Sequence, residues 1–180
     1  MWEALLKRYW LVTCLKESPA NTPYSPVMMI FAAFWFFMVI IIQWYLADIK
    51  QQFTLANSIL AALTLLCSYF VYTFVILKIN RKVNRALQTL TSLLVSHTMI
   101  HFFAFPLLLA VPFLAKANLA QPAIVFIGMI YLFLTLSLTL WQFIVTIYIY
   151  KKSLDLDSLA ATLAGFGLLA CNFLTVSFWH

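Results

Sequence analysis

His97 and His101 are the residues whose type and spacing could carry chemistry in this sequence. A helix would place both imidazoles on one face, because residues four positions apart lie one above the other. Both histidines lie in an apolar stretch, where ionisable groups commonly mark a functional site. Two imidazoles could bind a haem or a metal ion, although a metal ion needs further ligands. We keep a redox or metal site as an alternative hypothesis and expect no cofactor.

Three amide side chains lie in other apolar stretches and could bond to the histidines: Gln43, Gln142 and Asn172. Amides within membrane spans commonly join neighbouring helices by hydrogen bonds. No Asp or Glu lies in the apolar stretches, so a proton relay would lack a carboxylate partner. We therefore expect neutral histidines bonded to such amides across a helical bundle. These five residues form the candidate polar site.

The composition indicates that these residues lie in an integral membrane protein. Of 180 residues, 65% are hydrophobic and 9% are charged, whereas soluble domains carry roughly 25% charged residues. The net charge of +6 does not indicate nucleic-acid binding, because the basic residues are divided among short segments between apolar stretches. Such segments are typical contacts to anionic lipids. We treat residues 1–180 as one membrane domain in a lipid bilayer.

Five apolar segments are long enough to cross a hydrocarbon core of about 30 Å as helices. Before them, residues 2–17 form a predicted amphipathic helix in the membrane interface. Pro106 and Pro112 predict a kink in the third span. The expected fold is an all-α polytopic bundle with spans at about 27–47, 55–77, 86–115, 123–150 and 158–179.

The basic residues predict the orientation of the chain. Alternating the segments between two sides places nine Lys and Arg residues on one side and two, Lys50 and Lys116, on the other. The positive-inside rule then predicts a cytoplasmic N-terminus and an external C-terminus. We expect the membrane to be a bacterial inner membrane. The segment between the second and third spans contributes most to this asymmetry and is expected to contact lipid headgroups through Lys78, Arg81, Lys82 and Arg85.

Ala161 and Gly165 form a pair of small residues on the last predicted span. Small residues at this spacing allow helices to approach closely. The pair therefore predicts tight helix packing, either inside the monomer or between protomers.

Two segments carry a resemblance to a known family: the proline-containing stretch from Asn21 to Pro26, and the stretch from Arg85 to Leu94 that leads into the third span. Over roughly residues 20–178 the chain resembles small bacterial membrane proteins of the Yip1-like group. The resemblance implies a non-enzymatic membrane protein with five helices that works through partners.

No nucleotide-binding loop and no metalloprotease or serine-hydrolase motif is present in the sequence. We therefore expect no catalytic residues. The expected function is an interaction or accessory subunit of an inner-membrane assembly, whose partners are other membrane proteins or further copies of the chain. The alternatives are the redox or metal protein described above and a small transporter or channel.

Overall fold

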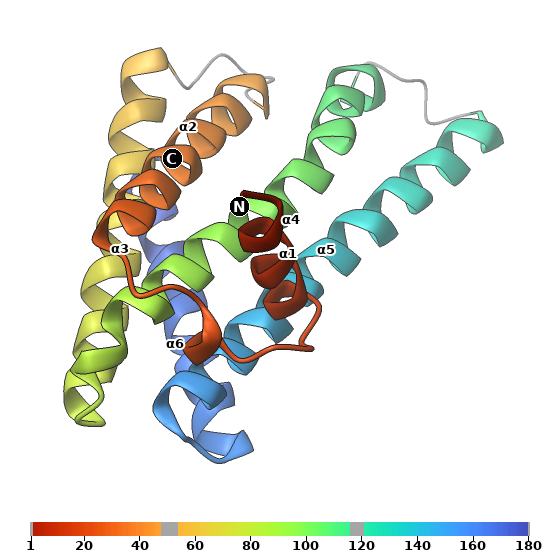
Figure 1. The fold of residues 1–180 in the computed structure, drawn as a ribbon. Helices are drawn as coiled ribbons and strands as arrows, with labels where there is room; N and C mark the ends of the chain where they lie inside the picture. The colour runs from red at the N-terminus through yellow and green to blue at the C-terminus, as the bar shows by residue number, and fades with distance from the viewer. Residues whose placement is uncertain (1, 48–53, 116–120, 180) are drawn as a thin grey trace.

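The computed structural model of the chain describes residues 2–47, 54–115 and 121–179. It confirms the predicted all-α class, and no strand occurs in these three ranges (Figure 1). Five of the helices are long and apolar enough to cross a membrane, as expected for a multi-pass membrane protein. The helices are α1 (Trp2–Thr13), η1 (Pro19–Asn21), α2 (Pro26–Ala47), α3 (Leu55–Ile79), η2 (Val83–Arg85), α4 (Ala86–Ala115), α5 (Pro122–Leu154) and α6 (Ser158–Ser177).

Short polar residues begin several of these helices. The Thr54 hydroxyl accepts a hydrogen bond from the Asn57 backbone N–H at 3.3 Å, and the Asp157 carboxylate accepts one from the Ala160 N–H at 2.8 Å. These bonds satisfy backbone donors that the first turn of a helix leaves unpaired. α5 ends at Asp155, which adopts the left-handed conformation with φ 55°.

The helices enclose one core to which each of the five long helices contributes. Fully buried side chains at its centre come from α2, α3, α4, α5 and α6 in turn: Phe36, Tyr69, Leu93, Ile149 and Leu168. α4 contacts α1, α2, α3 and α5, whereas α6 packs against α3 and α5. α4 therefore lies at the centre of the bundle and carries both histidines into it.

α4 remains one continuous helix across Pro106 and Pro112. Each proline removes one backbone donor, which weakens the helix locally without ending it. Figure 1 shows that the path of α4 is curved rather than straight.

α1 is shorter than predicted and packs partly against the bundle. It ends at Thr13, because Leu15 turns into the left-handed conformation with φ 62°. Its Thr13 hydroxyl bonds to Ser96 Oγ on α4 at 2.9 Å, and Trp141 Nε1 of α5 donates to the Thr13 carbonyl at 3.1 Å. Tyr9 on the same helix is also fully buried. Part of the face that we expected to meet lipid is therefore covered by protein.

The second half of α4 and the first half of α5 form a hairpin that stands apart from the other helices (Figure 1). We call residues 102–115 and 122–140 the α4–α5 hairpin. We compared the most apolar stretch of 18 residues in each span. In α5 none of these residues is buried, whereas in the other four spans between 22% and 28% are buried. Large side chains such as Phe113 and Phe133 are 78% and 69% exposed. The first half of α5 is therefore less covered by the rest of the described chain than the other spans are.

Candidate intramembrane polar site

Four of the five predicted polar-site residues line one cavity of about 290 Å³ inside the bundle, which we call the central cavity. They are His97 and His101 of α4, Gln142 of α5 and Asn172 of α6. The remaining wall is mostly apolar, and no charged residue contributes to it. The other lining residues are Ile40, Trp44, Leu65, Tyr69, Thr139, Phe143, Thr146, Gly165, Leu168, Leu169, Phe173 and Val176.

Hydrogen bonds use both ring nitrogens of His97. Tyr69 Oη lies 2.6 Å from Nδ1, and Thr146 Oγ1 lies 2.9 Å from Nε2. The Thr146 hydroxyl donates its single proton to the Gln142 carbonyl at 2.8 Å, so it must accept a proton from His97 Nε2. Nδ1 is then the acceptor and receives the Tyr69 hydroxyl proton. The network therefore assigns to His97 the neutral tautomer that carries its proton on Nε2. The same bonds join α3, α4 and α5 around the ring.

His101 lies one turn further along α4 and has a different environment. Its ring contacts Phe36 with centroids 6.0 Å apart, and its nitrogens form no hydrogen bond with the described residues. It also lines an adjoining cavity of about 160 Å³ between α4 and α5, together with Thr139 and Gln142. His101 is therefore the imidazole that remains available to a ligand.

The two amides of the cavity are each bonded to neighbouring side chains. Gln142 Nε2 lies 3.2 Å from His97 Nδ1. The Ser68 hydroxyl donates to the Leu65 carbonyl at 2.7 Å, and its Oγ lies 3.1 Å from the side-chain amide of Asn172. The Asn172 amide also bonds to the Tyr69 hydroxyl. Gln142 Oε1 has no hydrogen bond with the part of the chain that the structure describes. Gln142 thus offers a free acceptor beside His101.

Gln43 lies outside the central cavity. Its Nε2 donates to the backbone carbonyl of His101 at 2.9 Å, and its side chain is buried between α2 and α4. The next carbonyl along α4, that of Phe102, would normally accept a hydrogen bond from the backbone N–H of residue 106. Residue 106 is a proline and has no N–H to donate. Gln43 therefore joins two helices at the place where the helical backbone is weakened.

The two side chains that fix His97, Tyr69 and Thr146, were not predicted from the sequence. Tyr69 and Thr146 are buried on α3 and α5, where they could be taken for ordinary core or back-bonded residues. The spacing of Thr146 and Gln142, four positions apart on one helix face, was the available signal. Serine and threonine within a span usually bond to their own helix, and Thr135, Ser137 and Thr139 do so as expected.

The hydrogen bonds of His97 argue against its binding a metal ion. A metal ligand must offer a nitrogen lone pair, and the only lone pair on the neutral ring already accepts from Tyr69. Coordination by His97 would therefore require the Tyr69 bond to break. Among the described residues, no group of three His, Cys, Asp or Glu side chains could hold a metal ion.

Ala161 and Gly165 pack inside the monomer, which was one of the two alternatives. Ala161 is fully buried. A Cβ atom added at Gly165 would lie 2.9 Å from Ile147 Cγ1 of α5. The small residues thus allow α6 to approach α5 closely.

Two of the four basic residues near η2 form ion pairs with the end of α5. Lys82 Nζ lies 2.6 Å and Arg85 Nη1 lies 3.1 Å from the Asp155 carboxylate. Arg85 also donates to the Ser153 carbonyl at 3.0 Å, where a cation stabilises the helix C-terminus. Lys82 and Arg85 together hold the pKa of the Asp155 carboxyl below its usual value.

The other two basic residues of this segment, Lys78 and Arg81, are both exposed at the same end of the bundle. They form no ion pair with the described residues. They are therefore the pair most free to contact lipid headgroups. Lys50 and Lys116, which complete the predicted charge asymmetry, lie outside the described residues.

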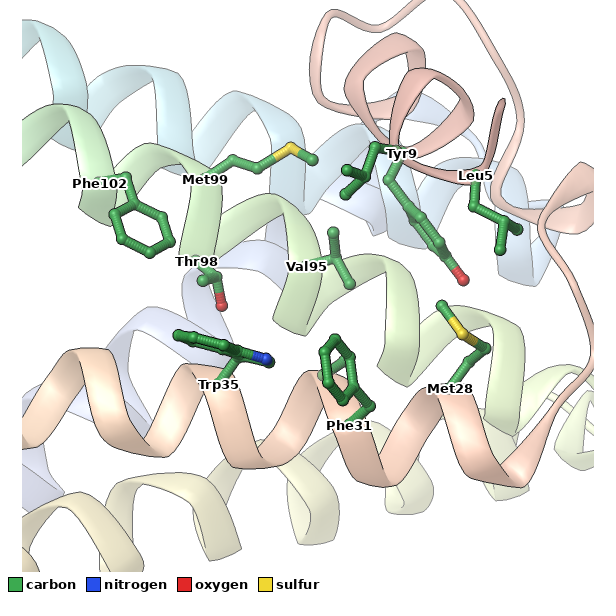
Figure 2. Close-up of a pocket in the computed structure, with 11 residues that line it drawn as sticks. Leu5, Tyr9, Met28, Phe31, Trp35, Val95, Thr98, Met99 and Phe102 are labelled. Atoms are coloured by element: carbon green, nitrogen blue, oxygen red, sulfur yellow. The ribbon is translucent and has the colours of Figure 1, made fainter. Parts of the chain in front are cut away.

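A third cavity, of about 460 Å³, lies between α1, α2 and α4 (Figure 2). Its wall is almost wholly apolar, and the Thr98 hydroxyl on it donates to the Leu94 carbonyl at 2.7 Å. Figure 2 shows Trp35 and Phe31 of α2 facing Val95 of α4 across it. We call this space the apolar cavity, because it offers hydrocarbon surface and almost no polar contact.

No family model matches the chain, and no curated protein or solved structure matches it either. The resemblance to the Yip1-like group stays a prediction from the sequence.

Proposed function

We propose that the protein is a non-enzymatic accessory subunit that binds a transmembrane helix of another membrane protein through its α4–α5 hairpin. The observation that carries this proposal is the absence of buried residues in the first half of α5. In its most apolar stretch no residue is buried, unlike in the other four spans. A span that the rest of its own chain leaves uncovered can pack against another protein.

The residues on the face of α5 that is turned toward α4 favour contact with another protein over contact with lipid alone. Tyr131, Thr135 and Leu138 on this face line the cavity between α4 and α5. Gly128 belongs to the same face by helical spacing, and a Cβ atom added there would meet no atom within 4 Å. Small and hydroxylated residues are enriched where membrane helices contact one another, because backbones can approach closely there.

We also propose that the N-terminus is cytoplasmic and that the membrane is the bacterial inner membrane. The contacts of the basic segments support this orientation. Gln88, at the start of α4, donates to the carbonyl of Ala20 at 2.9 Å, and Lys82 and Arg85 bond to Asp155. The segments that carry most of the positive charge thus meet at one end of the bundle, as the positive-inside rule requires. A C-terminal reporter that is active only outside the cytoplasm would test this orientation.

The mass of the particle extracted from native membranes tests the proposed function. A polymer that excises membrane discs without detergent should release the chain together with a second membrane protein. Gly128→Leu fills the open face and should remove the second protein without lowering the melting temperature. Ala170→Leu, at an exposed site on α6, is the matched control and should keep the partner. A wild-type disc that holds one copy of this chain and no other protein would contradict the proposal.

A small transporter or channel is a second candidate, favoured by the adjoining cavities that share His101, Thr139 and Gln142. Solute flux into liposomes that contain the purified protein would test it. Flux that is unchanged by His101→Phe and Gln142→Leu would count against a path along these residues.

A further inference from the structure

We propose that the central cavity binds the head of an uncharged amphiphile that carries both hydroxyl and carbonyl oxygens, such as a monoacylglycerol. This inference is independent of the proposed role of the hairpin. It concerns a different surface, formed by α4, α5 and α6 at His101, Gln142 and Asn172. Three features of the cavity specify the ligand: its uncharged wall, its free polar atoms and its size.

The wall selects an uncharged head. None of the residues that line the central cavity is Asp, Glu, Lys or Arg. His97 is fixed as a neutral ring by its bonds to Tyr69 and Thr146. A charged head would lose its hydration without gaining an ion pair, which is strongly unfavourable.

The free polar atoms select a head that both donates and accepts hydrogen bonds. Gln142 Oε1 can only accept, so it needs a hydroxyl or another donor from the ligand. His101 can donate to an oxygen acceptor such as a carbonyl, because one nitrogen of its neutral ring carries a proton and has no hydrogen bond with the described residues. A quinone head offers acceptors only and would leave Gln142 Oε1 without a donor.

The size of the cavity indicates how the ligand lies. Its volume of about 290 Å³ is at the small end of ligand cavities, which span about 300–1,000 Å³. A glycerol head with its ester fits, whereas a long acyl chain must extend beyond the cavity. Leu169 and Phe173 of α6 mark an exit away from the hairpin, because they line the central cavity and are exposed at the surface. The acyl chain would leave past α6 toward hydrocarbon.

Saturable binding of a radiolabelled monoacylglycerol to the purified full chain in nanodiscs tests the proposal. The fatty acid of the same chain length is the charged comparison, and a short-chain quinone is the acceptor-only comparison. We expect the monoacylglycerol to bind at least tenfold more tightly than either, because each comparison loses a hydrogen bond or carries an unpaired charge.

Variants then locate the site. His101→Phe keeps a ring beside Phe36 and removes both nitrogens, and Gln142→Leu removes the acceptor. Each should weaken binding by about tenfold, the loss of one good hydrogen bond. Gln43→Leu is the matched control, because it removes an amide from the same bundle but outside the cavity, and it should change binding less than twofold. Melting temperatures identify any variant that fails to fold, and His101→Leu or Gln142→Met then replaces it in the comparison.

Four results would overturn the proposal. The absence of saturable monoacylglycerol binding would mean that the cavity holds water. Equal binding of the fatty acid would refute the uncharged head, and equal binding of the quinone would refute the required hydroxyl. A loss in Gln43→Leu as large as that in His101→Phe would place the binding elsewhere. None of these results depends on whether a protein partner occupies the hairpin.

Discussion

Glycine occurs in two regions of the bundle with opposite surroundings. A Cβ atom added at Gly167 of α6 would lie 1.9 Å from Tyr72 Oη of α3, and one added at Gly165 would meet Ile147 of α5. A Cβ atom added at Gly128 of α5 would meet nothing within 4 Å. The same residue type thus serves close packing inside the chain in α6 and leaves an uncovered face in α5.

This difference contrasts a region that is closely packed within the chain with one that is not, and the second is where we propose partner binding. α6 uses its small residues to fit between α3 and α5, and the Tyr72 hydroxyl donates to the Ala164 carbonyl at 2.7 Å. The α4–α5 hairpin has no comparable neighbour within the chain. We therefore assign stability to the region around α6 and partner binding to the hairpin.

The largest expected effect is the loss of stability in Gly167→Ala. The new methyl group would overlap the Tyr72 side chain, so Tyr72 must move and give up its bond to Ala164. Overpacking of this kind costs about 1–3 kcal/mol, which the unfolding of the purified protein in mixed micelles would measure. Combining it with Tyr72→Phe removes the overlapping oxygen and should recover part of the loss. A Gly167→Ala protein as stable as the wild type would contradict the packing described for α6.

His97→Leu should be the next most destabilising change. It leaves the buried Tyr69 hydroxyl without its main partner and breaks the link to Thr146. The expected loss is about 1–2 kcal/mol, since hydrogen bonds between membrane helices are modest in net strength. His101→Leu should cost less stability, because the ring nitrogens of His101 have no hydrogen bond with the described residues to lose. The reverse order in the same unfolding assay would refute the structural role given to His97.

Gly128→Ala should stabilise the isolated protein slightly. Nothing obstructs the added methyl group, and alanine is favoured over glycine within a helix by roughly 0.5–1 kcal/mol. The same assay that detects a loss in Gly167→Ala should therefore detect a small gain in Gly128→Ala. A loss at Gly128 would show that this face is already packed within the monomer.

The smallest expected effect is a change in the stability of the fold at acidic pH. Lys82 and Arg85 lower the pKa of Asp155 in the folded state, so the ionised carboxylate stabilises the fold above the unfolded-state pKa of about 3.9. That contribution is lost as the pH falls through the lower folded-state pKa. Asp155→Asn should lower the melting temperature slightly at pH 6 and have no effect near pH 2. An equal effect at both pH values would exclude the ion pairs as its cause.

The sequence predicted the fold class because each long apolar segment can satisfy its backbone only as a helix in the membrane. It also identified four residues of the central cavity, since polar side chains are rare in spans and tend to face one another. It did not identify Tyr69 or Thr146, because which hydroxyl reaches His97 depends on how α3 and α5 rotate against α4. For the same reason it did not predict that Tyr9 of α1 is buried against the bundle or that Gln43 lies outside the cavity.

A photo-crosslinking scan along α5 in living cells tests the central claim most directly. A photoreactive residue would be placed in turn at Gly128, at Phe133 on the hairpin, and at Leu163 on the exposed side of α6. We predict that Gly128 gives a discrete crosslink to another membrane protein, that Phe133 gives a weaker one, and that Leu163 gives none. Crosslinks equally strong from all three positions, or none from the two hairpin positions, would contradict the assignment of partner binding to the α4–α5 hairpin.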